Sequence, residues 1–165
     1  MGIRFVFGKA GDVDLDPSGR TGAALLYVFE EGFAENPNNS SVLYVVGPQG
    51  VGCSVSPKPE RGPQYAEPEF LEAVSRCGRN ALDVVAGFNK ICEERDRISN
   101  VRWCLVSGGV FRHPSCGKVD IAKATVRGMR RAEDAVKLSG VDLTVTLLYD
   151  EDCFRTALMQ LAEER

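Results

Sequence analysis

The chain lacks the features that mark membrane and secreted proteins. Its 165 residues contain no run near the roughly 18 apolar residues that a membrane-spanning helix needs. The N-terminus shows no signal-peptide layout, so we expect a soluble, cytoplasmic protein with no membrane partner. A single histidine, His113, excludes a metal centre built from several histidines.

Cysteine is present, but not in the spacing that metal sites or disulfide frameworks use. No two of the six cysteines lie closer than twelve residues, whereas zinc sites usually offer ligands two to four residues apart. Disulfides are rare in proteins without a secretory signal. We therefore expect no metal site, and we expect most of the cysteines to be small buried apolar residues.

Charge of one sign is not in large excess. Twenty Lys and Arg against 23 Asp and Glu give a net charge of −3, which argues against nucleic acid as a partner. With 44% hydrophobic and 26% charged residues the composition is that of a globular protein. The length predicts one domain over residues 1–165.

What is present is an alternation of strand and helix patterns. β-rich runs predict strands near residues 3–7, 42–47, 101–107 and 142–148. Apolar residues at three- and four-residue steps predict helices at 70–92, 119–138 and 153–161, and an apolar run predicts a short buried helix at 23–29. This order predicts an α/β fold, a three-layer α/β/α sandwich with a mostly parallel mixed sheet and residues 42–46 as a central strand.

Glycine-bearing loops follow several of these strands. In Ser107-Gly108-Gly109-Val110-Phe111, adjacent glycines would let backbone amides converge on an anion, and we expect positive φ angles there. The alternative is a tight turn with Phe111 plugged into the core. Gly19, Arg20, Thr21 and Gly22 precede the helix expected at 23–29, where amides would point toward a ligand or form a plain helix entry.

Catalytic constellations are weakly represented. Cys116 stands three residues from His113, but the sequence identifies no Asn or Asp to orient the imidazole. Asp12, Asp14 and Asp16 alternate like cation ligands, yet the remaining positions of a calcium loop are missing. We expect no catalytic residue, no metal and no cofactor.

From residue 42 onward the chain resembles a macrodomain, the ADP-ribose-binding module. The resemblance rests on the strand ending in Val45-Val46-Gly47-Pro48, on Cys104 to Phe111, and on Val145 to Phe154, which occur in the family's order. It implies that Ser107, Gly108, Gly109 and Val110 hold a phosphate through their amides, that Phe111 packs on a ribose, and that Tyr149 and Asp150 lie near the adenine.

The first quarter departs from that pattern. Gly8-Lys9-Ala10-Gly11 stands where the family carries Asn-Ala-Ala-Asn, so both asparagines are glycine. The resemblance thus implies binding of ADP-ribose, a related nucleotide diphosphate or an ADP-ribosylated protein, without efficient catalysis. Two alternatives are open: a hydrolase of ADP-ribosyl or phosphate esters with Asp12 or His113 as base, and a degenerate macrodomain that binds protein partners.

Overall fold

The computed structural model describes residues 3–6, 21–29, 41–59 and 62–164, and these form a mixed α/β fold. The strands are β1 (Ile3–Val6), β2 (Ala24–Phe29), β3 (Ser41–Val45), β4 (Gln49–Gly50), β5 (Gln64–Tyr65), β6 (Asn100–Trp103) and β7 (Thr144–Leu147). The helices are α1 (Glu69–Ile91), α2 (Lys118–Arg131), α3 (Glu133–Leu138) and α4 (Glu151–Glu163), with a 3₁₀ turn η2 at Glu94–Asp96. The α/β class expected from the sequence is therefore confirmed.

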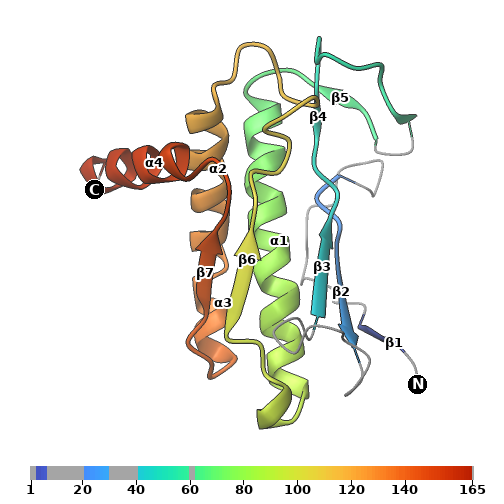
Figure 1. The fold of residues 1–165 in the computed structure, drawn as a ribbon, viewed down its shortest axis with the longest axis vertical. Coiled ribbons are helices and arrows are strands. Elements are labelled where there is room, and N and C mark those ends of the chain that lie inside the picture. The colour runs from blue at the N-terminus through green and yellow to red at the C-terminus, as the bar shows by residue number, and fades with distance from the viewer. Residues whose placement is uncertain (1–2, 7–20, 30–40, 60–61, 165) are drawn as a thin grey trace.

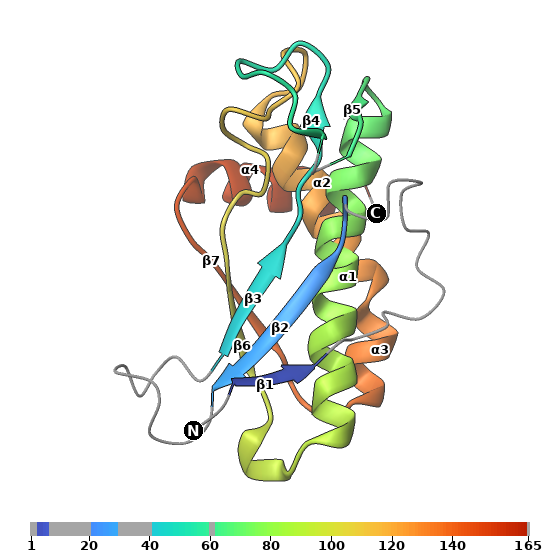
Figure 2. The same ribbon diagram turned by 90° about the vertical axis from the view of Figure 1, so that its right-hand side faces the viewer.

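The strands pair in three groups. β1, β2 and β3 form an antiparallel sheet in that order, with Leu26 opposite Leu43, while β4 pairs with β5 and β6 with β7 in parallel. Figure 2 shows β2, β3, β6 and β7 on one side of the molecule and α1 and α3 on the other, and in Figure 1 β6 and β7 lie in front of α1 and α2.

The predicted sandwich around a mostly parallel sheet fails at two points. The sequence predicts a helix at residues 23–29, but Ala24–Phe29 is strand β2, because an apolar run this short shows no period that separates a helix from a strand. β2 then pairs antiparallel with β3 and leaves β3 at the edge of its sheet. The expectation of a central strand at 42–46 is wrong, and Tyr44 on β3 is 57% exposed.

The other expected elements are found with shifted ends. β1, β6, β7, α1 and α4 lie where the sequence predicts strands and helices. The helix expected over 119–138 is divided at Ala132, whose φ of −90° and ψ of 0° end α2 before α3 begins. None of the described helices combines the length and apolar composition needed to cross a membrane.

The hydrophobic core lies between α1, α2 and the strands. Phe70, Val74 and Val85 of α1 are at most 1% exposed, and they belong to one cluster with Trp103 of β6 and Phe154 of α4. The three- and four-residue spacing of α1 therefore marks its buried face, as the sequence indicates.

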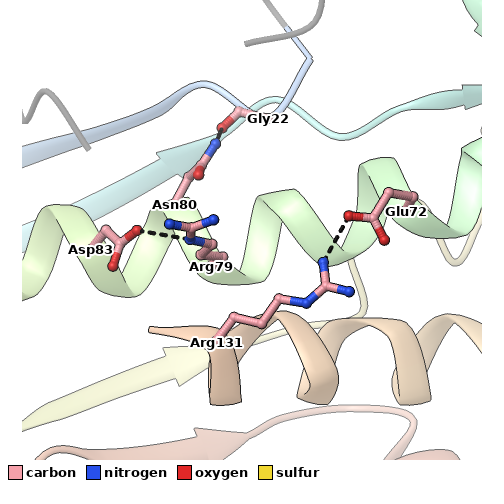
Figure 3. A network of polar contacts seen from close by, with 6 residues as sticks. All are labelled: Gly22, Glu72, Arg79, Asn80, Asp83 and Arg131. Atoms are coloured by element: carbon pink, nitrogen blue, oxygen red, sulfur yellow. Dashed lines mark hydrogen bonds and ion pairs between the residues drawn. The ribbon is translucent and has the colours of Figure 1, made fainter. Parts of the chain in front are cut away.

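Polar contacts fix α1 to its neighbours on two sides (Figure 3). The Asn80 side-chain amide donates to the Gly22 carbonyl oxygen at 2.8 Å, which holds the segment before β2 against α1. Glu72 of α1 and Arg131 of α2 form an ion pair at 2.7 Å, and Arg79 pairs with Asp83 one turn further along α1.

The cysteines are less buried than the sequence suggests. All six lie in described parts of the chain and are free, but Cys77 and Cys116 alone among them are buried and Cys104 is exposed. Burial raises the pKa of the Cys77 thiol to about 12, so this thiol stays protonated at neutral pH.

A buried asparagine fixes the connection between α1 and β6. The Asn89 side chain donates to the Ile98 carbonyl oxygen at 2.8 Å and accepts from the Ile98 N–H at 2.7 Å. Asn89→Ala leaves both backbone groups without this partner, so we expect the free energy of unfolding to fall by about 2 kcal/mol. Urea denaturation measures the loss. A change below about 0.5 kcal/mol would show that water replaces the amide at no cost.

Candidate functional site

Two loops that follow β3 and β6 meet at one end of the molecule. The first spans the described residues from 46 to 59, and the second spans residues 104–117 (Figures 1 and 2). Three hydrogen bonds join these loops. The Gly50 N–H donates to the Phe111 carbonyl oxygen at 2.9 Å, and the Ser54 hydroxyl donates to the Val110 carbonyl oxygen at 3.1 Å. From the second loop, the Ser107 hydroxyl donates to the Pro48 carbonyl oxygen at 2.8 Å. We call residues 48–58 and 107–113 the paired-loop surface.

Glycine makes the close approach of these loops possible. A Cβ atom on Gly47 would lie 2.3 Å from the Ser107 Oγ, and one on Gly50 would lie 2.4 Å from the His113 Cα. Both distances are below what real Cβ atoms tolerate, and at Gly50 the neighbour is backbone, so a larger residue there would push the loops apart. Gly50 is thus needed for contact of the first loop with the second.

The Ser107–Phe111 loop has a positive φ, as expected, but not at its glycines. Ser107 has φ of 57°, whereas the glycines with positive φ in the described chain are Gly22, Gly52, Gly62 and Gly140. Gly108 is instead needed for packing, since a Cβ there would lie 2.5 Å from Leu105, and its N–H donates to the Leu105 carbonyl oxygen. Gly109 has open space beside it.

Cationic and apolar groups are exposed on the paired-loop surface. Val110 is 54% exposed, Arg112 is exposed, and the Lys58 ammonium lies 5.9 Å from the centre of the Phe111 ring. None of the ion pairs found among the described residues involves Lys58 or Arg112. These two charges are therefore not neutralised by a described carboxylate partner.

Three basic residues of α2 differ from Lys58 and Arg112 because they form ion pairs. Lys123 and Arg127 both bind Glu164, and Arg131 binds Glu72, at distances from 2.5 to 2.7 Å. The paired carboxylates reduce the attraction of this helix face for an anion.

The other residues expected at a ligand site do not all come to this surface. Thr21 and Gly22 are buried, and Gly22 is held by Val46 and Asn80. Gly19 and Arg20 lie outside the described residues, as do Asp12, Asp14 and Asp16. Strand β2 stands in place of the helix that residues 19–22 were expected to precede.

Tyr149 and Asp150 form the turn between β7 and α4. Tyr149 is 76% exposed, and both residues have positive φ angles, of 55° and 33°. The Asp150 carboxylate binds the Lys118 ammonium at 2.5 Å, which ties this turn to the start of α2. Asp150 is thus held in an ion pair with Lys118, the residue that directly follows the second loop.

Cys116 is unsuited to act as a nucleophile. Burial, together with the negative charges of Glu67 and Asp120, raises the pKa of its thiol to about 11. The thiolate fraction at neutral pH is therefore very small, and a Cys116–His113 dyad would lack its reactive form.

Comparison with known proteins defines a class of relatives that the sequence patterns did not suggest. Two curated relatives, both named as DNA/RNA-binding proteins, align with this chain over 146 residues, which is 85% of the chain. They are DNA/RNA-binding protein ALBA4 of Plasmodium falciparum, at 27% identity, and its namesake of Plasmodium yoelii yoelii, at 26%. The chain is thus a distant homologue of an Alba-family protein and spans about a third (35%) of the length of these relatives.

Other comparisons give no match. No protein-family model matches the chain, and no solved structure matches it. The evidence on function from these comparisons therefore comes from the two curated relatives.

The resemblance to a macrodomain is wrong. The expectations that followed from it are wrong as well: binding of ADP-ribose, and the alternatives of a hydrolase or a degenerate macrodomain. Its motifs are short glycine-rich strand ends, which many α/β proteins share. The argument against nucleic-acid partners is also wrong, because relatives that cover 85% of the chain carry that function in their names. Net charge averages over the chain and does not report the local charge that a polyanion meets.

Lys58 and Arg112 are candidates that the sequence patterns did not reveal. Each stands in a loop after a strand, but neither belongs to a continuous run of basic residues, and they are 54 positions apart along the sequence. The hydrogen bonds between the loops place both residues on one surface. No local sequence signal would have paired them.

Proposed function

We propose that this chain binds nucleic acid through the paired-loop surface. The alignment with two DNA/RNA-binding proteins over 85% of the chain carries the proposal. Lys58 and Arg112, two exposed cations without an ion-pair partner among the described carboxylates, support the choice of surface. Phosphate contacts from Lys and Arg supply most of the affinity that does not depend on base sequence.

The loop residues would act beside these cations. A Cβ placed on Gly109 would have no neighbouring atom within 4 Å, so a phosphate or sugar can approach the backbone there. Val110 and Phe111 offer apolar surface for contact with a base or sugar. The Ser107–Phe111 loop expected to hold a phosphate thus keeps that role in the proposal, with the polynucleotide backbone as its ligand.

A second exposed basic group provides the competing surface. Arg97 and Arg102 line a groove of about 490 Å³ between β3 and β6, together with Asn100 and Thr146. Asn100 and Thr146 bind each other at 3.1 Å on this sheet face. We favour the paired loops because they combine cations with glycine backbone and an apolar tip, whereas the groove offers charge without the glycine loop.

The test is a binding titration with charge-reversal variants. We expect Lys58→Glu with Arg112→Glu to weaken binding of a fluorescein-labelled single-stranded RNA and of a duplex DNA by about tenfold or more. If each cation meets one phosphate, the slope of log K against log salt becomes shallower by roughly 1.4 for the single strand and 1.8 for the duplex. Fluorescence anisotropy at several salt concentrations measures both quantities.

The matched control is Arg97→Glu with Arg102→Glu, which changes the net charge equally on the other surface. Binding that survives this control and fails in the loop variant supports the proposal. Binding lost in the control alone would assign the interface to the groove instead. A wild-type chain that binds neither probe would contradict nucleic-acid binding altogether.

A further inference from the structure

Three potential metal ligands of different chemistry come together beside the paired-loop surface. One carboxylate oxygen of Glu67, one ring nitrogen of His113 and the Sγ of Cys116 all lie within 4.8 Å of one another. Glu67 precedes α1, whereas His113 and Cys116 precede α2. The sequence did not suggest this group, because Glu67 is 46 positions from His113.

The surroundings hold the two deeper ligands in place. The His113 ring lies 6.1 Å from the Phe70 ring, and the backbone of Gly50 packs against His113 closely enough to exclude a Cβ atom. The Cys116 N–H donates to the His113 carbonyl oxygen at 3.0 Å, and Cys116 is 2% exposed. Glu67 is exposed, so its side chain is the ligand that can move.

We propose that Glu67, His113 and Cys116 bind a zinc ion. Sulfur, imidazole nitrogen and carboxylate oxygen are the three donor types that Zn²⁺ takes in proteins. Tetrahedral Zn²⁺ with these donors would place the ligand atoms about 3.4–3.6 Å apart. The three atoms lie within 4.8 Å of one another, so a side-chain movement of roughly 1 Å brings them to zinc-binding distance. Water supplies the fourth ligand from the exposed side of Glu67.

Binding requires two local changes. The Cys116 thiol gives its proton to solvent when the Zn–S bond forms. The 3.2 Å hydrogen bond from the Ser115 N–H to the His113 Nδ1 is given up whichever nitrogen binds, because neutral imidazole has one lone pair for the metal and a proton on its other nitrogen. The ion would join the chain before α1 to the loop that carries Phe111 and Arg112.

Cobalt(II) tests the site without nucleic acid, so its result is independent of the proposed function. We expect the full chain to take up one Co²⁺, with a thiolate-to-cobalt absorption band in the near ultraviolet and tetrahedral d–d bands that Zn²⁺ displaces. Cys116→Ser should abolish the thiolate band. Glu67→Ala and His113→Ala should each weaken binding by roughly tenfold or more.

Controls separate this site from the remaining cysteines. Cys53→Ser changes a partly buried thiol on the first loop, and Cys104→Ser an exposed one, and both should leave cobalt uptake unchanged. Glu67 is exposed, so Glu67→Ala tests the site even if Cys116→Ser fails to fold. No uptake by the wild-type chain, or uptake that Glu67→Ala and His113→Ala leave unchanged, would overturn the proposal.

Discussion

Replacing Gly128 by alanine is expected to lower the free energy of unfolding by about 3 kcal/mol, with a fall in Tm of roughly 6–12 °C. A Cβ at this position of α2 would lie 1.9 Å from the Ser75 carbonyl oxygen of α1. The contact is with backbone, which cannot rotate away, so the two helices must separate. The same separation would loosen the core between them.

The direction of this change in the free energy of unfolding is opposite to the usual effect of alanine in a helix. Alanine in place of glycine within a helix ordinarily stabilises the fold by about 0.5–1 kcal/mol. Gly87 of α1 is exposed, and a Cβ there would meet no atom within 4 Å. Gly87→Ala should therefore raise the free energy of unfolding by that ordinary amount. Thermal and urea denaturation of both variants measure the contrast, and equal changes in the two would contradict the close crossing of α1 and α2.

Gly50→Ala is expected to weaken nucleic-acid binding by about tenfold or more while most of the fold remains. The new Cβ would lie 2.4 Å from the His113 Cα and 2.5 Å from its backbone nitrogen. The first loop must then move away from the second, which breaks the hydrogen bond from Gly50 to Phe111. Lys58 and Arg112 would no longer share one surface, and misplaced charges contact phosphates less well.

Gly87→Ala is the control variant. A Cβ on Gly87 meets nothing within 4 Å, and the residue lies on α1, outside the paired-loop surface, so both loops should keep their conformation. Hydrogen exchange measures whether the Gly50 N–H loses protection in Gly50→Ala, and anisotropy measures RNA binding in both variants. Intact binding in Gly50→Ala, despite lost protection, would show that the paired loops are not the interface.

The sequence by itself determined those elements whose pattern is long or bounded by clear turns. The 23 residues of α1 repeat their apolar positions at helical spacing over many turns, and they form a helix with that face buried. β6 and β7 follow from β-rich runs near glycine and polar turns. A positive φ in the Ser107 loop is also expected from the sequence, although it falls on the serine.

Whether a short apolar run forms a helix or a strand was decided by the strands it pairs with. Ala24–Phe29 has the composition of a buried segment, and only pairing with β1 and β3 makes it a strand. That pairing in turn moved β3 to the edge of its sheet. Hydrogen bonds between strands join residues far apart along the chain, so no window of the sequence contains the information.

The candidate surface belongs to the tertiary structure for the same reason. Lys58 and Arg112 come together because Gly50 allows two loops to touch, and Glu67 reaches His113 and Cys116 because α1 and α2 begin at the same end of the core. The chain's composition marked it as a globular protein with a net charge of −3, and the order of its strand and helix patterns predicted the α/β class. Where its charges and metal-ligand side chains meet was decided by packing, since charge acts over ångströms in space and not over positions in a sequence.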